Sequence, residues 1–204
     1  MSHLPQVADV LDSFTTARNL LADFIESENN MTSVYLFAEK LAATFLSKNK
    51  ILSCGNGGSM CDAMHFAEEF TGRFRDDRPS LPAIAISDPS YITCTANDYG
   101  YDEVFSRYVE GVGQKGDLLL GISTSGNSPN VINAVTAAKE KGLYTVCLLG
   151  KDGGLLKDQA DLSFVIPAKT SDRIQEVHIK IIHIAIEITE KIILAKDNYQ
   201  SFQV

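Results

Sequence analysis

Apolar side chains recur at helical spacing in the first quarter of the chain. Between Val7 and Phe24 they return every three or four positions, which predicts a helix. The same spacing between about Met31 and Leu46 predicts a second helix. Both segments precede the first strand-like run, so we expect these two N-terminal helices to serve mainly in subunit packing.

From residue 50 onward, short β-type runs alternate with helical patterns. The runs are apolar almost throughout instead of alternating, which is typical of parallel strands buried on both faces. They cover 50–54, 83–86, 117–122, 144–149 and 162–166. Helices are expected at about 58–71, 89–97, 102–111, 129–141 and 172–195, with a short turn near 153–158.

This alternation predicts an α/β fold, a three-layer, doubly wound, parallel five-stranded sheet flanked by helices. No repeat or clear linker interrupts it, so we predict a single domain over 1–204. Its parts are an N-terminal helical extension at about 5–48 and an α/β core at about 49–196. Ligands in such folds bind beyond the carboxyl ends of the strands, which selects 54–60, 87–98 and 123–128.

Composition is that of a globular protein, with 45% hydrophobic and 22% charged residues among 204. Lysine and arginine number 18 against 26 acidic residues, a formal charge of −8. This balance argues against a nucleic-acid partner. An anionic substrate would also be repelled overall, so a phosphate site here must act through local geometry.

The sequence also indicates a reducing compartment. Four cysteines, Cys54, Cys61, Cys94 and Cys147, are scattered without a CxxC pair and are expected to be reduced. The N-terminus lacks the basic and apolar regions of a signal peptide, and the apolar runs are shorter than a membrane span. We therefore expect a cytoplasmic protein without membrane contact.

A hydroxyl-rich loop joins the third predicted strand to its helix. Ser128 is placed to cap the helix and Pro129 falls at the first helical position. Free backbone N–H groups at a helix N-terminus, together with neighbouring hydroxyls, can hold an anion without a lysine. Alone, the loop is equally consistent with a polar turn. Its four hydroxyls belong to Ser123, Thr124, Ser125 and Ser128.

A glycine-rich loop, Cys54–Ser59, follows the first predicted strand. Its glycines let the backbone approach a ligand, and the Asn56 amide is suited to sugar hydroxyls. The glycine spacing is neither that of a Rossmann loop nor that of a Walker loop. On its own this motif is a weak indicator of function.

Two helices carry candidate catalytic groups. His65 and Glu69 are four residues apart, so they project from one helix face; a surface pair is the simpler interpretation of such spacing. In the last helix, His183 lies among isoleucines and alone would be read as a core histidine. A partly buried imidazole nevertheless suits acid–base work near pH 7.

Four ordered segments together resemble one enzyme family. The strand, hydroxyl-rich loop and helix at 117–141 are similar to those of the sugar isomerase (SIS) domain, and nearly the whole chain resembles the bacterial phosphoheptose isomerases. Met60 stands where related sequences often have histidine. The segments are CGNGGSMCDAMHFAEEFTGRF (54–74), PAIAISDPSYITCTANDYGYDEVFSRYVE (82–110), GDLLLGISTSGNSPNVINA (116–134) and DRIQEVHIKIIHI (172–184).

The resemblance implies isomerisation of sedoheptulose 7-phosphate to D-glycero-D-manno-heptose 7-phosphate, an early step toward ADP-heptose and the lipopolysaccharide core. It implies a cytoplasmic homotetramer that binds zinc. Glu69 is the candidate base at carbon, and His183 the candidate for ring opening and the oxygen proton. Arg73, one turn further along the helix, is placed to orient Glu69 or to stabilise enediolate charge.

The resemblance also assigns ligands to the remaining positions. Phosphate is assigned to Ser123, Thr124, Ser125 and Ser128. The sugar is assigned to Asn56, Gly57, Gly58, Asn97 and Asp98, with Glu69, Arg73 and Gln175 also on the substrate. The metal is assigned to His65, Glu69, Gln175 and His183.

Helix geometry adds a constraint, because Gln175 and His183 lie about 12 Å apart along one helix and are rotated by roughly 80°. We therefore keep open a site that joins residues of more than one subunit. The rival interpretation is a non-catalytic protein of the same fold that binds the bacterial replication initiator. Such a protein has no need for Glu69 and His183, and their presence favours the enzyme.

Overall fold

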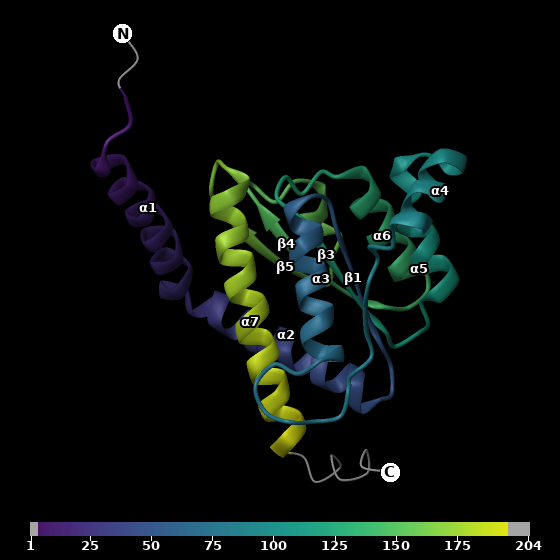
Figure 1. The fold of residues 1–204 in the computed structure, drawn as a ribbon. Coiled ribbons are helices and arrows are strands. Elements are labelled where there is room, and N and C mark those ends of the chain that lie inside the picture. The colour runs from purple at the N-terminus through teal and green to yellow at the C-terminus, as the bar shows by residue number, and fades with distance from the viewer. Residues whose placement is uncertain (1–3, 196–204) are drawn as a thin grey trace.

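The computed structural model describes residues 4–195 and shows a single parallel sheet between two layers of helices (Figure 1). The predicted domain limits (residues 1 and 204) and the predicted end of the α/β core (about residue 196) lie outside the described residues. Within it, no helix is both long enough and apolar enough to cross a membrane.

All five predicted strands form, and they pair in parallel in the order β2-β1-β3-β4-β5. Every residue of the central strands β1 and β3 is buried, which explains their continuous apolar character. The bounds are β1 Ile51–Gly55, β2 Ala83–Ala85, β3 Leu118–Ser123, β4 Tyr144–Gly150 and β5 Leu162–Ile166.

The strand order places a topological switch point between β1 and β3. From β1 the chain crosses to β2 on one side, whereas from β3 it proceeds to β4 and β5 on the other. Register pairs Gly55 with Ile122, so these two strands end side by side. The loops that follow them therefore border the crevice in which doubly wound proteins bind ligands.

One face of the sheet is covered by α2 (Glu28–Leu46), α3 (Gly58–Thr71) and α7 (Ser171–Ala195). Phe37 of α2 stacks on Phe66 of α3 with ring centroids 6.2 Å apart. The ring of Phe66 meets that of Phe70 edge to face at 5.1 Å. This aromatic packing fixes α3 against the sheet, and α7 packs on both α2 and α3.

The opposite face carries α4 (Pro89–Tyr99), α5 (Ser106–Val112) and α6 (Pro129–Glu140). Their buried residues, such as Val109 and Val131, belong to one core cluster with Leu119 of β3. Short 3₁₀ helices, Tyr101–Glu103 and Leu155–Asp158, complete this layer. The three-layer doubly wound prediction is confirmed.

The first helix, α1 (Val7–Glu26), has no buried residue and projects from the body of the protein (Figure 1). Its side chains Val7 and Phe14 are 86% and 71% exposed. By contrast, α2 contributes Phe37, Leu41 and Phe45 to the core. The two N-terminal helices thus differ: α2 belongs to the globular body, and α1 leaves an apolar face uncovered.

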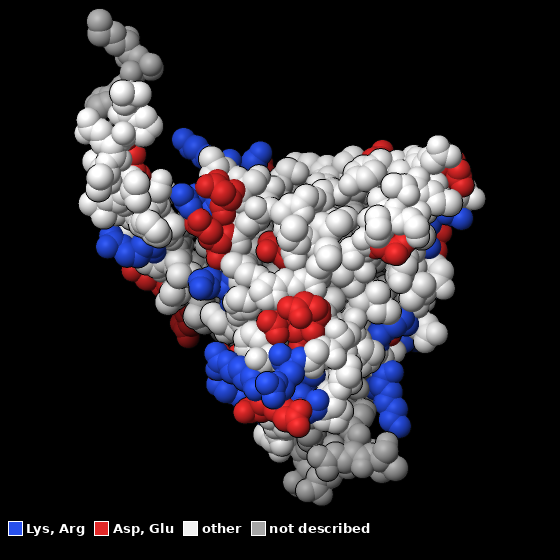
Figure 2. Space-filling model, in the orientation of Figure 1, with Lys and Arg blue, Asp and Glu red and all other residues white. Residues whose placement is uncertain are grey.

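Charged side chains of both signs are interspersed on the face drawn in Figure 2. Among the described residues on that face, basic patches lie directly beside acidic ones and do not merge into one extended basic surface. On this face the charges therefore do not form the extended basic stripe that is typical of nucleic-acid binding.

All four cysteines lie within the described residues and are free. Cys54 and Cys147 are buried, whereas Cys61 and Cys94 are exposed. Burial raises the pKa of the Cys147 thiol to about 12, so it remains a neutral packing group at physiological pH.

Candidate active site

The glycine-rich loop turns tightly from β1 into α3. Gly57 has a φ of +55°, a conformation that favours glycine. A side chain at Gly55 would meet the Ser59 carbonyl at 2.7 Å, and one at Gly58 would meet the Gln175 amide at 2.7 Å. The loop backbone is therefore held close to α7, with its N–H groups at the start of a helix.

In the hydroxyl-rich loop between β3 and α6, serine side chains hydrogen-bond to one another. Ser128 occupies the N-cap position and Pro129 the first helical position, as expected. The Ser128 hydroxyl does not bind the helix backbone, however; it lies 2.9 Å from the Ser123 hydroxyl, which in turn is 3.4 Å from that of Ser125. These hydroxyls converge beside the uncapped N-terminus of α6, an arrangement suited to a phosphate.

Two residues outside the predicted set join these loops. The amides of Asn56 and Asn130 exchange two hydrogen bonds of 2.9 Å, and the Tyr101 hydroxyl donates to Asn56 Oδ1 across 2.9 Å. Asn130 is only 1% exposed, at the start of α6. The only signal for it in the sequence was its place in the serine-loop motif, and Tyr101 had none of its own.

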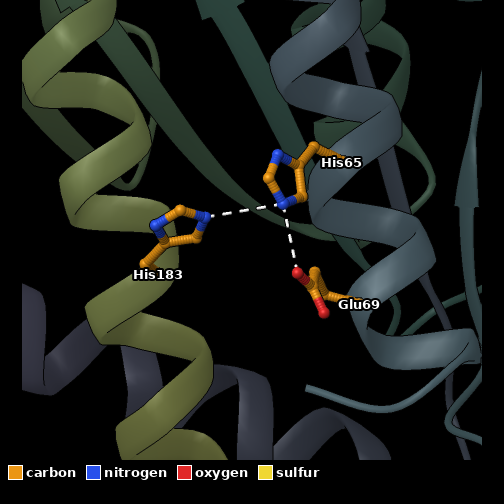
Figure 3. A group of neighbouring side chains, drawn as sticks. All are labelled: His65, Glu69 and His183. Atoms are coloured by element: carbon orange, nitrogen blue, oxygen red, sulfur yellow. Dashed lines mark hydrogen bonds and ion pairs between the residues drawn. The ribbon is translucent and has the colours of Figure 1, made fainter. Parts of the chain in front are cut away.

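His65, Glu69 and His183 gather between α3 and α7 (Figure 3). His65 Nε2 lies 3.1 Å from Glu69 Oε1 and 3.5 Å from His183 Nε2. Their ligand atoms all lie within 4.8 Å of one another. Two nitrogens and one carboxylate oxygen at this spacing fit a zinc ion or a proton-transfer group.

The surroundings of this group favour a neutral imidazole at His183. Partial burial lowers the pKa of His183, and the neighbouring His65 lowers it further, while Glu69 acts in the opposite direction. A neutral imidazole can accept a proton or bind a metal. His178, five residues earlier, is the true core histidine: it is fully buried and hydrogen-bonds to the Leu149 carbonyl at 2.9 Å.

Other predicted residues lie elsewhere. Gln175 contacts Gly58 and lies 3.4 Å from the Ser59 hydroxyl, near the first turn of α3. Arg73 does not extend the Glu69 helix, because α3 ends at Thr71 and Gly72 caps it; Arg73 is exposed in the following segment.

Asn97 and Asp98 lie near the end of α4. Both are exposed, and Asn97 donates a hydrogen bond to Asp98 across 2.9 Å. Tyr101, three residues after Asp98, connects this region to the glycine-rich loop through Asn56.

Comparisons with known proteins agree with the fold. The SIS domain family matches residues 14–150, from within α1 to the end of β4. The chain therefore belongs to the SIS domain family.

Individual relatives show to which group of SIS proteins the chain belongs. A phosphoheptose isomerase from Fusobacterium nucleatum is 58% identical over 94% of this chain and 98% of its own length. Solved phosphoheptose isomerases from Neisseria gonorrhoeae and Francisella tularensis are 39% and 29% identical, with TM-scores of 0.81 and 0.87. They cover 89% and 92% of this chain, and 98% and 100% of their own. Within the SIS proteins, the chain belongs to the phosphoheptose isomerases.

Proposed function

We propose that this protein is an isomerase that interconverts sedoheptulose 7-phosphate and D-glycero-D-manno-heptose 7-phosphate, early in heptose biosynthesis. The observation that carries the mechanism is the group of His65, Glu69 and His183, whose reactive atoms approach within 4.8 Å. Acid–base groups of this kind are what an aldose–ketose isomerase needs and a binding module does not.

The hydroxyl-rich loop is the proposed phosphate anchor. Ser123, Thr124, Ser125 and Ser128 offer hydroxyl donors, and the N-terminus of α6 adds backbone N–H groups and a favourable dipole. Neutral donors of this kind bind a phosphate despite the chain's net charge of −8. The sugar would then lie against Asn56, Gly57 and Gly58, with Asn97, Asp98, Arg73 and Gln175 as further proposed contacts.

The proposed chemistry moves two protons through a cis-enediol. Glu69 removes the proton from C1 of the open-chain ketose and returns it to C2. His183 supplies a proton to O2 and receives one from O1, after assisting ring opening. Its lowered pKa keeps the imidazole neutral near pH 7, so it can shuttle a proton in either direction.

Zinc is the proposed metal. His65, Glu69 and His183 provide the nitrogen and oxygen donors that zinc accepts, and Gln175 is the proposed fourth ligand. When bound, zinc would polarise the oxygens at C1 and C2. Without a thiolate, this set should bind zinc more weakly than a structural site does. Dialysis against a chelator, followed by titration with Zn²⁺, measures both the affinity and the dependence of turnover on the ion.

A non-catalytic protein that binds the replication initiator is not favoured. The relative from Fusobacterium nucleatum carries the isomerase name at 58% identity over nearly the full length of both chains. The chain also retains both Glu69 and His183, which binding alone would not require.

The direct test is turnover. Purified protein is incubated with sedoheptulose 7-phosphate, with and without zinc, and the aldose product is followed by NMR. Glu69→Gln should abolish turnover while the substrate still raises the melting temperature, because the phosphate loop is intact. Ser125→Ala should weaken binding, raising KM.

Glu39→Gln is the matched control, because Glu39 is exposed on α2 and lies outside the proposed site. It should leave kcat unchanged. Absence of turnover by the wild type, both with and without zinc, would contradict the proposal. Full activity of Glu69→Gln would show that Glu69 is not the base.

We further propose a homotetramer in the cytoplasm. The exposed apolar face of α1 supports self-association, as does a groove of about 820 Å³ between α1 and α7. Gln175 of α7 lies against the first turn of α3, apart from the group in which His183 of the same helix meets Glu69. This separation is consistent with a site that also recruits residues from neighbouring subunits. Light scattering on wild type and on Phe14→Asp tests this, since the charge should shift the tetramer toward smaller species. Cell fractionation tests the compartment.

A further inference from the structure

A buried ion pair lies next to the candidate active site. Arg78 and Glu190 are 8% and 4% exposed, and Arg78 Nε donates to Glu190 Oε1 across 2.6 Å. Removing both charges from water is costly, so a pair at this depth is weak evidence for stability alone. It connects the segment that follows α3 with α7, which suggests a geometric role.

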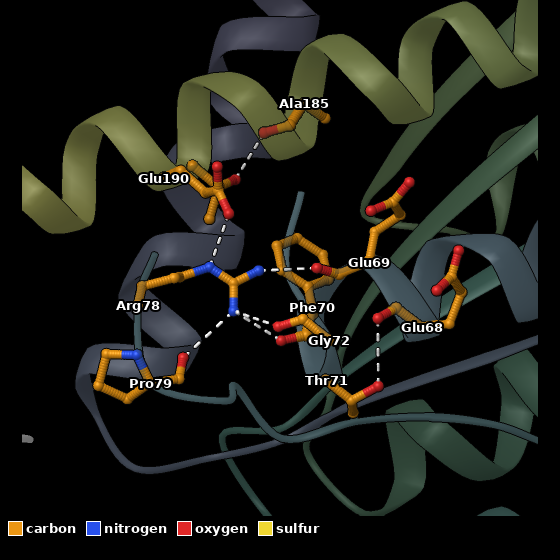
Figure 4. Close-up of polar contacts among 10 residues, drawn as sticks. Glu68, Glu69, Phe70, Thr71, Gly72, Arg78, Pro79, Ala185 and Glu190 are labelled. Carbon is orange, nitrogen blue, oxygen red and sulfur yellow. Dashed lines mark hydrogen bonds and ion pairs between the residues drawn. The ribbon is translucent and has the colours of Figure 1, made fainter. Parts of the chain in front are cut away.

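The same guanidinium binds the end of α3 (Figure 4). Nη2 donates to the Glu69 carbonyl across 2.7 Å, and Nη1 donates to the Phe70 carbonyl across 2.8 Å. Nη1 also lies 3.4 Å from the Gly72 carbonyl. These are the carbonyls that a helix end leaves without intrahelical partners. The Arg78 side chain therefore binds the backbone carbonyl of Glu69, the proposed base.

On α7, Glu190 is seven residues beyond His183. Seven residues make almost two full turns, so the two side chains share a helix face about 10 Å apart along the axis. Fixing Glu190 to the end of α3 consequently fixes the height of His183 relative to Glu69. Figure 4 shows the guanidinium between the two helices, with Glu190 on one side and the α3 carbonyls on the other.

We propose that Arg78, through Glu190, is a positioning residue for the isomerisation, setting the separation of the Glu69 and His183 helices. The inference rests on the proposed roles of Glu69 and His183. Arg78 itself does not contact the substrate in this scheme. We call the contacts of Arg78 with Glu190 and with the α3 carbonyls the clamp. Displacement of a reacting group by about 1 Å can cost about a hundredfold in rate, so loss of the clamp should reduce kcat.

A neighbouring exposed pair supplies a matched control. Arg75 Nη1 lies 2.9 Å from Glu187 Oε1, and so connects the same segment to the same helix. The Arg75 side chain is 57% exposed, and surface pairs of this kind contribute little. If any contact between the segment and α7 were sufficient, loss of this pair would resemble loss of the buried one.

Three variants test the proposal: Glu190→Gln, Arg78→Lys and the control Arg75→Ala. Glutamine retains the acceptor oxygen without the charge, and lysine retains the charge without the fork that reaches four carbonyls. Each is assayed with sedoheptulose 7-phosphate below its own melting temperature. We expect kcat to fall more than about fivefold in both clamp variants, with KM nearly unchanged, and to stay within about twofold for Arg75→Ala.

A purely structural pair would lower the melting temperature but leave the kcat of folded protein within fivefold of wild type, which overturns the proposal. Equal losses in Arg75→Ala also overturn it. Should Arg78→Lys fail to fold, Glu190→Gln decides, because it is nearly isosteric. A crystal structure of Glu190→Gln gives a readout independent of turnover, the His65–His183 Nε2 separation, which is 3.5 Å here. If wild type shows no turnover, a longer separation supports the clamp while the proposed function fails, and an unchanged one overturns the clamp.

Discussion

Gly126, in the middle of the hydroxyl-rich loop, has a φ of +65° and faces the backbone of the loop after β4. A methyl group placed there would lie 1.9 Å from the Gly153 carbonyl oxygen. Gly57 in the other ligand loop offers a matched comparison. Its φ is +55°, but a methyl group would meet nothing within 4 Å. Alanine at the two positions therefore separates dihedral strain from collision.

Both variants carry a dihedral cost, because φ is positive at each position and sparsely populated backbone conformations cost about 1–3 kcal/mol. Gly126→Ala adds the collision, and forcing an extra methyl group into a packed site typically costs about 1–3 kcal/mol more. We therefore expect unfolding free energies to fall by about 1–3 kcal/mol for Gly57→Ala and by about 2–6 kcal/mol for Gly126→Ala. In a chain of this size each kcal/mol lowers the melting temperature by about 2–4 °C.

Urea unfolding of both variants measures these free energies, and calorimetry with the sugar phosphate measures binding. Gly126→Ala should also weaken binding, because relief of the collision displaces Ser125 and Ser128, which lie one and two residues from the glycine. Equal stability losses in the two variants would refute the reasoning, since only Gly126 has the carbonyl in its way. Unchanged affinity in Gly126→Ala would separate the loop from the phosphate.

Three further outcomes follow from single contacts. Burial lowers the pKa of His178 to about 4, so between this value and the ordinary histidine pKa the unfolded chain binds a proton that the folded protein does not. The free energy of unfolding should therefore fall by about 1.4 kcal/mol per pH unit from about pH 6.5 to 4. His178→Gln should flatten this pH profile of urea unfolding. Tyr101→Phe removes one hydrogen bond to Asn56 and should raise KM by about two- to tenfold at an unchanged melting temperature; an unchanged KM would argue against Asn56 as a sugar contact. Phe37→Ala should cost about 3–5 kcal/mol by urea unfolding, because Phe37 is fully buried.

The fold could be predicted well from the sequence because strand burial leaves a direct trace. Continuous apolar runs such as Leu118–Ser123, alternating with helical patterns, are typical of a covered parallel sheet. The candidate ligand loops at 54–60, 87–98 and 123–128 followed from the rule that ligands bind beyond the carboxyl ends of parallel strands. The start of α2 was placed near Met31 instead of Glu28, since the Ser27 cap depends on a hydrogen bond of 3.4 Å that no periodicity shows.

The candidate site was harder to predict, because its side chains meet through long-range packing. Spacing placed His65 and Glu69 on one face but did not indicate that His183 would join them from α7. The Arg78–Glu190 pair spans 112 positions, and neither residue sits in a recognisable local motif. The placement of Arg73 failed for a related reason, since the end of α3 at Thr71 depends on the carbonyl contacts of Arg78.

The position of α7 at the end of the described chain has a consequence for biosynthesis. During synthesis, a ribosome that has completed β5 has produced the whole sheet and both ligand loops, yet not the helix that carries His183. Until α7 docks, the faces of α2 and α3 that pack on it stay uncovered. The nascent chain is therefore both inactive and prone to aggregate until one late docking step covers the core and brings His183 to Glu69.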